Sequence, residues 1–272
     1  EAKNTEFKTD TTSEVFGAFG YLTELNLFKK TENKLTQLLT PKVLFRYAPD
    51  YMRKESSGSK LNHLNIFTLD RLNTNNNFEG GLSTTIGFDY EIQGSNDQKQ
   101  FGLTMGQVIN EKENKNMPSS SSLDEKLSDV VGNMSYQINE KTNLNYNFAI
   151  DQNYNDLNFN EISTDIDLET IKFNFGYLQE KKHIGDQEYM RAKIDLAKSS
   201  NGLFSAETKR NLVTNSAEYY NLSYEYLNDC LRAGIVYRRE FYEDSELEAE
   251  NSLMFKITFV PFGNINSPSF SQ

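Results

Sequence analysis

The chain of 272 residues contains no tryptophan, one cysteine and two histidines. A lone cysteine excludes a disulfide within the chain. No stretch approaches the roughly 18 consecutive apolar residues that a membrane-spanning helix needs, which excludes a helical membrane protein. Positive charge is scarce too, because 28 Lys and Arg residues face 39 Asp and Glu residues, leaving a net charge of −11. Proteins that grip nucleic-acid phosphates usually carry a net basic face, so we expect no nucleic-acid partner.

What the sequence does contain is an alternation of apolar and polar residues with a period of two. In one segment Leu82, Ile86 and Tyr90 fall on one side of the alternation, and Ser83 and Asp89 fall on the other. The clearest segments are residues 82–92, 144–150, 171–177, 220–226, 231–237 and 253–259. Successive side chains of a strand point to opposite faces, so each segment predicts a strand with one apolar face and one polar face.

Weaker strand-like segments and polar connections complete the pattern. The weaker segments are residues 15–27, 36–47, 64–69, 101–108, 130–138, 158–168, 188–196 and 204–212. The total is about 13 or 14 strands, each near the ~9–11 residues that cross a bilayer at a tilt. Short polar turns are predicted at residues 139–142, 199–202 and 214–216, and longer polar loops at residues 53–62, 74–78, 93–99 and 111–126. Short turns at one end and long loops at the other are typical of outer-membrane barrels, so we expect an all-β, antiparallel transmembrane β-barrel.

Two soluble architectures, a β-sandwich and a β-solenoid, share this pattern, because alternation also describes a half-buried sheet. A two-sheet sandwich would place turns about every 8–12 residues around a compact core. The polar face here is instead uniformly rich in Asn, Asp, Glu, Lys and Arg, which favours a barrel with a wet interior. A sheet in lipid must close on itself, and the predicted strands allow either a small closed barrel or part of a larger one.

No catalytic constellation stands out in the sequence. His63 and His183 lie in or beside polar loops, far apart in the chain and without a metal-binding motif. Gly80 and Gly81 favour a tight turn or bulge over a phosphate-binding loop. The acidic pairs with a spacing of two, which we interpret as solvated faces rather than Ca²⁺ sites, are Asp165/Asp167 and Glu246/Glu248. No GxSxG motif is present, so we expect no enzyme activity, cofactor or metal.

Two features near the C-terminus carry hypotheses. Cys230 begins a strand just after a turn, and it is either a small rim residue or the disulfide partner of a segment outside this chain. Arg232, Arg238 and Arg239 follow it closely and form a candidate lumenal basic cluster. If these side chains face the interior, they meet phosphate groups or, on the simpler interpretation, the surplus lumenal carboxylates.

Several motifs occur together in an order that resembles a known family. Residues 224–244 combine a Tyr-rich strand, an acidic residue followed by Cys230, and an apolar strand that ends in Tyr-Arg-Arg before an acidic loop. The upstream motifs are Pro41-Lys42-Val43, Arg46-Tyr47-Ala48-Pro49, Phe67-Thr68-Leu69-Asp70-Arg71, Glu79-Gly80-Gly81, Gly106-Gln107-Val108 and residues 128–132. In this order, over about residues 35–262, they resemble the LptD family of lipopolysaccharide-assembly outer-membrane proteins. Each motif is weak alone, and the combination is what makes the resemblance specific.

The resemblance implies a single-chain barrel of about 26 strands that follows an N-terminal periplasmic β-jellyroll. Members of the family receive lipopolysaccharide from a periplasmic bridge protein and insert it into the outer leaflet. In many members an LptE-like lipoprotein plugs the lumen, and the first and last barrel strands meet at a lateral seam. By resemblance Cys230 pairs with a cysteine of the N-terminal region. The seam residues of the last strand are then Leu253, Phe255, Ile257 and Phe259.

On this resemblance, residues 1–272 are the C-terminal part of the barrel and residues 263–272 are a short tail. The jellyroll and the first barrel strands are missing, which agrees with a count of 13 or 14 strands. Some relatives carry two adjacent cysteines where this chain has Asp229-Cys230, so we expect no alternative disulfide pairing.

The leading hypothesis is lipopolysaccharide transport and assembly in the Gram-negative outer membrane. A polar lumen would carry the sugar head, which is costly to expose to hydrocarbon, while a seam releases the acyl chains into the leaflet. The expected partners are lipopolysaccharide, outer-membrane lipids, an LptE-like plug lipoprotein and a periplasmic bridge protein. A general porin or nutrient-uptake barrel is the alternative, and an outer-membrane hydrolase is a third hypothesis that the missing catalytic motif disfavours.

Overall fold

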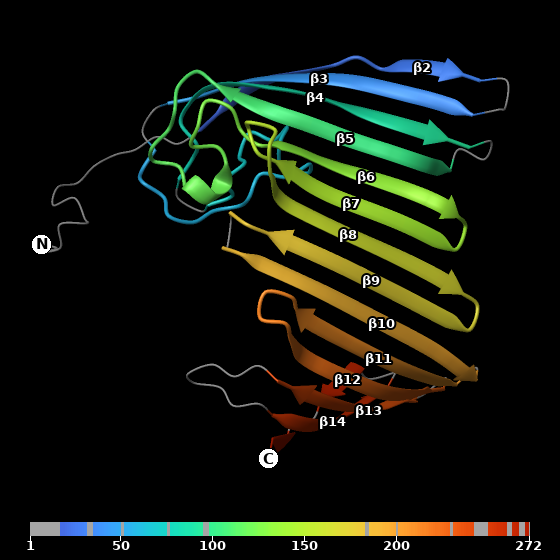
Figure 1. Cartoon of the computed structure of the whole chain (residues 1–272). Helices are drawn as coiled ribbons and strands as arrows, with labels where there is room; N and C mark the ends of the chain where they lie inside the picture. Colours follow the sequence, from blue (N-terminus) through green and yellow to red (C-terminus); the bar gives the residue numbers. More distant parts are fainter. Residues whose placement is uncertain are drawn as a thin grey trace, which may run out of the picture.

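The computed structural model forms one antiparallel sheet (Figure 1). The described residues are 17–31, 35–49, 52–74, 77–94, 98–182, 185–199, 201–228, 231–241, 250–259, 263–266 and 270–271. The strands are β1 (Phe19–Glu24), β2 (Leu27–Lys30), β3 (Thr36–Ala48), β4 (Gly81–Gln93), β5 (Lys99–Asn110), β6 (Val130–Asn139), β7 (Thr142–Ile150), β8 (Leu157–Leu168), β9 (Ile171–Glu180), β10 (Gln187–Ser199), β11 (Gly202–Asn211), β12 (Ser216–Leu227), β13 (Leu231–Glu240), β14 (Asn251–Phe259), β15 (Gly263–Asn266) and β16 (Phe270–Ser271). The predicted all-β antiparallel fold is confirmed.

Strand order in the sheet follows chain order from β3 to β15. β1 and β2 both pair with β3, and β15 and β16 both pair with β14. The sheet is strongly curved and open, and among the described residues no pairing joins β1 to β14 or β15 (Figure 1). The only helix in the described part of the chain is the short 3-10 turn η1 (Ser119–Ser121). No described helix has the length and apolar character needed to cross a membrane.

The alternation in the sequence becomes two chemically different faces of the sheet. On β4 the side chains of Leu82 and Ile86 are 46% and 50% exposed, whereas Ser83 and Thr85 between them are buried. Pairing carries this parity across the sheet, because residues opposite each other in neighbouring strands point to the same side. The exposed apolar residues of the outer face include Phe45, Tyr47, Leu82, Ile86, Tyr136, Ile162, Tyr220, Leu222, Tyr224, Ile235 and Tyr237.

The two ends of the sheet differ in the length of their connections. At one end β6 and β7 are joined by Glu140 and Lys141 alone, and β8 and β9 by Glu169 and Thr170. At the other end lie the β3–β4 loop (residues 49–80) and the β5–β6 loop (residues 111–129), which gather on the concave side of the sheet (Figure 1). We call these the turn end and the loop end.

Two predictions are wrong, one about a loop and one about a strand. The long loop expected at residues 93–99 joins β4 to β5 at the turn end, where the other connections are short. The strand expected at residues 64–69 is a series of turns, in which the amide of Ile66 donates to Asn62 O and that of Thr68 donates to Asn65 O. Residues 64–69 alternate in sequence, but within the described residues no strand pairs with them. The side chain of Ile66 instead packs against the inner face of the sheet.

A hydrophobic core forms where the two long loops meet the inner face of the sheet. The loop members of this core are Met52, Leu61, Ile66, Leu72, Met117 and Leu123, and the strand members are Val108, Val131 and Ala149. Glycines on the inner face make room for the loops. A Cβ atom at Gly87 would lie 2.8 Å from the Phe67 ring, and one at Gly106 would lie 2.9 Å from Ile66 Cδ1.

Candidate functional site

The inner face of the sheet divides into two parts that differ in what covers them. We call the inner face of β3–β7 the capped half, because the β3–β4 and β5–β6 loops lie over it at the loop end. The inner face of β8–β14 is the open half. Within the described residues, no hydrophobic side chain after Ala149 is fully buried, so the open half is a wet polar wall.

Buried charges hold the β3–β4 loop against the capped half. Arg71 Nε of the loop donates to Glu79 Oε2 at 2.8 Å, and a second guanidinium nitrogen pairs with Glu79 Oε1. Arg71 also donates to Ser83 Oγ at 2.9 Å and to Thr85 Oγ1 at 3.2 Å, both on the inner face of β4. Arg46 of β3 donates to the Glu79 carbonyl oxygen at 2.7 Å. This network satisfies charges that would be costly to bury alone, and it fixes the loop to two strands.

The same loop reaches the boundary of the open half. Lys60 forms an ion pair with Glu180 at the end of β9, and its Nζ lies 3.1 Å from the centroid of the Phe159 ring. Burial lowers the pKa of Lys60 below its usual range and likewise lowers the pKa of His63. Burial also raises the pKa of Asp129, which lies just before β6. The loops that cover the capped half therefore carry partly buried titratable groups where they border the open half.

The open half carries charged side chains that are paired with one another across the strands. Arg191 Nε on β10 donates to Glu207 Oε1 on β11 at 2.8 Å, and Tyr219 OH on β12 donates to the same oxygen at 2.7 Å. Arg238 on β13 lies 4.5 Å from the centroid of the Tyr219 ring. These contacts form a continuous polar ladder over four strands. A ladder of this kind neutralises charge locally and leaves the wall hydrated.

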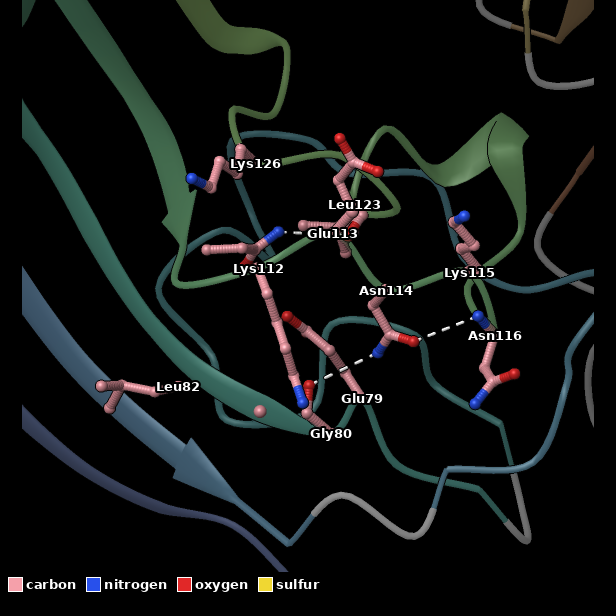
Figure 2. A pocket seen from close by; sticks show the side chains of 12 residues that line it. Glu79, Gly80, Leu82, Lys112, Glu113, Asn114, Lys115, Asn116, Leu123 and Lys126 are labelled. Atoms are coloured by element: carbon pink, nitrogen blue, oxygen red, sulfur yellow. Dashed lines mark hydrogen bonds between the residues drawn. The ribbon is translucent and has the colours of Figure 1, made fainter.

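At the loop end a pocket of about 470 Å³ opens beside the start of β4, as Figure 2 shows. Asn114 Nδ2 donates to the Gly80 carbonyl oxygen at 3.4 Å, and the amide of Asn116 donates to Asn114 Oδ1 at 3.1 Å. The charged lining residues are Glu79, Lys112, Glu113, Lys115 and Lys126. Because both signs of charge line this pocket, it favours no ligand of a single charge.

The structure does not form the predicted basic cluster. Arg232 lies on the inner face and pairs with Glu225 at 2.5 Å, while Arg238 lies on the same face and pairs with Glu240 at 2.5 Å. These two arginines are six positions apart on one strand, which is about 20 Å. Arg239 follows Arg238 directly and so points to the outer face. The expectation of one cluster is wrong, because neighbouring strand residues face opposite sides and each inward arginine has its own carboxylate.

The predicted seam residues lie in β14. Leu253, Phe255 and Ile257 are 43%, 45% and 42% exposed on the outer face, and the backbone of Phe259 pairs with Leu231. The side chain of Phe259 lies outside the described residues. Residues 263–272, expected as a tail, include β15 and β16, which pair along the other edge of β14.

The remaining candidate residues from the sequence are the cysteine, the second histidine and the two acidic pairs. Cys230, His183 and the pair Glu246/Glu248 lie outside the described residues. Asp165 accepts a hydrogen bond from Asn174, and Asp167 pairs with Lys172 at 2.8 Å. In the described ranges, no group of three or more His, Cys, Asp or Glu side chains gathers as a metal site.

Sequence reasoning missed the buried network of Arg71 and Glu79. Both residues occur in motifs that carry the family resemblance, but those motifs do not indicate that the two side chains meet. A basic and an acidic residue that flank one polar loop just before a strand were the available clue. The alternation pattern, however, does not indicate that a polar loop folds onto the inner face of the sheet.

Comparisons with known proteins point to one family. The family LptD, described as LPS transport system D, matches residues 1–224. No curated protein matches the chain. Among solved structures, one porin variant of Rhodopseudomonas blastica is 9% identical, with 91% of each chain covered and a TM-score of 0.38. Another variant is 8% identical, with 95% of this chain and 100% of that chain covered and a TM-score of 0.33. TM-scores this low do not establish that the chain and these porins share a fold.

Proposed function

We propose that this chain, which belongs to the LptD family, guides the sugar part of lipopolysaccharide along the open half of its inner face. Membership of the family assigns the chain to lipopolysaccharide transport and assembly at the outer membrane of Gram-negative bacteria. The observation that carries the finer proposal is the separation of the two faces. Exposed Tyr224 and Ile235 lie outside, and the paired charges of Arg191 and Glu207 lie inside, on the consecutive strands β10 to β13.

The physical problem is the amphipathic cargo. Its charged and hydroxylated sugars are costly to expose to hydrocarbon, whereas its acyl chains are stabilised there. The hydrated ladder of the open half offers the sugars hydrogen-bonding partners in place of bulk water. No covalent bond forms or breaks in this transfer, so it requires no catalytic residue.

We assign lateral release to the edge of β14 that faces away from β13. An unpaired sheet edge in lipid leaves backbone groups without partners, so a barrel strand must pair along its length. β15 pairs only with Lys256–Phe259 and β16 only with Ser252 and Leu253, so this edge is held by short ladders. In the complete protein this edge would meet the first barrel strand, with residues 1–272 as the C-terminal part of a larger barrel.

The remaining partners follow from the family and stand as part of the proposal. They are a periplasmic lipopolysaccharide-bridge protein and an LptE-like plug lipoprotein in the lumen. Cys230 would form a disulfide with a cysteine outside this chain. Replacing Cys230 by serine in the complete protein should then change its electrophoretic mobility without reductant, and an unchanged mobility would remove the disulfide.

Site-specific photo-crosslinking in cells tests the proposed path. A photoreactive residue at Ser223, on the inner face of β12, should form adducts with lipopolysaccharide detectable by an anti-lipopolysaccharide blot. The same residue at Tyr224, the next position, points outward and serves as the matched control for sugar contact. Equal adducts at both positions, or none at either, would contradict passage along the inner face. Rapid small-solute flux without adducts would favour the porin alternative.

A further inference from the structure

A cavity of about 650 Å³ lies on the open half, over β8 to β11. Gly176 of β9 lies at its floor, where it pairs with Ser163 of β8 on one side and with Arg191 of β10 on the other. No atom lies within 4 Å of the place where a Cβ of Gly176 would be. The depression is therefore open to the lumen and is not filled by the protein itself.

One side of the cavity presents fixed hydrogen-bond acceptors. Asn147 Nδ2 donates to Glu161 Oε2 at 2.9 Å, and Asn174 Nδ2 donates to Asp165 Oδ1. An ionised carboxylate has about four acceptor positions, so each of these groups keeps capacity for hydroxyl donors of a ligand. The amide partners hold both carboxylates in place on β8, which limits the ordering cost of binding.

The other side of the cavity presents donors and an aromatic ring. The Arg191 side chain is 59% exposed and its Nε donates to Glu207 Oε1, so its guanidinium supplies donors at this side of the cavity. Tyr189 on the same strand is half-buried, and Lys209 Nζ lies 3.9 Å from its ring centroid. The cavity therefore combines acceptors, donors and an aromatic surface within one concave wall.

We propose that this cavity is a saccharide-binding site, which takes one sugar unit of the lipopolysaccharide by its hydroxyl groups. A sugar ring offers hydroxyls that both donate and accept, and an apolar C–H face that packs on an aromatic ring. The volume lies within the range of about 300–1,000 Å³ that is usual for ligand pockets. The cations of the wall have acidic partners, Arg191 with Glu207 and Lys193 with Asp195 at 3.0 Å, so phosphate is the less suited ligand.

This inference rests on the proposed function, because it names the contact that the passing sugars would make. The site would act as a resting point on the path and would bind weakly enough to release its ligand. Its residues come from four neighbouring strands, β8 to β11, and so keep a fixed geometry without any loop.

The test uses the complete protein purified in detergent micelles. The probe is lipid-free, dephosphorylated core oligosaccharide, and its affinity is measured by isothermal titration calorimetry. Gly176→Leu fills the floor of the cavity and Asp165→Ala removes an acceptor. Each should weaken binding by about tenfold or more. Ala192→Leu places the same side chain on the outer face of β10, behind the cavity and away from the lumen, and should leave the affinity unchanged. Heat-modifiable migration on gels confirms that each variant is folded.

Three results would overturn the saccharide site. They are the absence of binding by the unmodified protein, unchanged affinity in both cavity variants, and full competition by inorganic phosphate. Failure of this site is separable from failure of the proposed function. If the cavity variants bind normally while Ser223 still crosslinks to lipopolysaccharide in cells, only the saccharide site is wrong.

Discussion

The capped half and the open half of the inner face are built from the same polar alternation, yet one is dry and the other is wet. In the capped half Arg46 and Ser83 are almost fully buried, whereas in the open half Arg191 and Arg232 stay exposed. The difference lies in the connections at the loop end, since the β3–β4 and β5–β6 loops are long and the connections after β7 and β11 are short. A polar strand face becomes a core only where a loop supplies both apolar cover and the counter-charges.

Among the tests of the difference between the two halves, removing the buried carboxylate of the capped half should have the largest effect. Glu79→Ala removes the carboxylate that pairs with buried Arg71 and lies 4.0 Å from Arg46, and breaking such a pair costs about 3–5 kcal/mol. We expect the β3–β4 loop to detach, with faster hydrogen exchange and new trypsin cleavage at residues 52–74. The matched control is Glu225→Ala in the open half, where the half-exposed partner Arg232 limits the loss to below about 1 kcal/mol. Equal protection of the loop in both variants would contradict the distinction between the halves.

Glycines on the inner face offer a second test, with a smaller effect. A Cβ atom at Gly87 would lie 2.2 Å from the Met105 carbonyl oxygen and 2.8 Å from the Phe67 ring, so Gly87→Leu overpacks the capped half. We expect a loss of about 1–3 kcal/mol in the free energy of unfolding. Gly176→Leu, on the open half, should leave the thermal transition unchanged. Folded fractions at increasing temperature, read from gel mobility, measure both, and equal losses would refute the assignment of the two halves.

The smallest expected effect concerns pH. Burial holds the pKa of His63 in the docked loop below its usual value of 6.5, so the docked state binds this proton less readily than the detached state. Docking is then fully stabilised above pH 6.5 and weakens as the pH falls through that value, because protonation favours the detached loop. The protection factors of the amides in residues 61–72, which correct for the pH dependence of the intrinsic exchange rate, should be lower at about pH 5.5 than at about pH 7.5.

The matched variant for the pH effect is His63→Asn. It should reduce the change in protection factor between these two pH values while leaving the amides of β10 to β13 unaffected. A pH response that persists in His63→Asn would assign the effect to other groups, such as Asp129, whose pKa burial raises.

Much of the fold could be predicted from the sequence, because side-chain parity in a strand is a local property. The segment 82–92 became β4 (Gly81–Gln93), and the segment 144–150 became β7 (Thr142–Ile150), each with the expected outer and inner residues. The same rule of parity places Arg238 and Arg239 on opposite faces, so the expected basic cluster already conflicted with it. The strand expected at residues 64–69 failed for a different reason, since alternation does not reveal whether a neighbouring strand is available.

By itself the sequence determined the alternating strands, their apolar outer face and their polar inner face, because each depends on residues two positions apart. The tertiary structure alone decided which polar residues became buried. Arg71 meets Ser83 and Thr85, and Lys60 meets Glu180, only after the β3–β4 loop folds into the concave side of the sheet. Such contacts join distant parts of the chain, and their free energy depends on desolvation that no local pattern records.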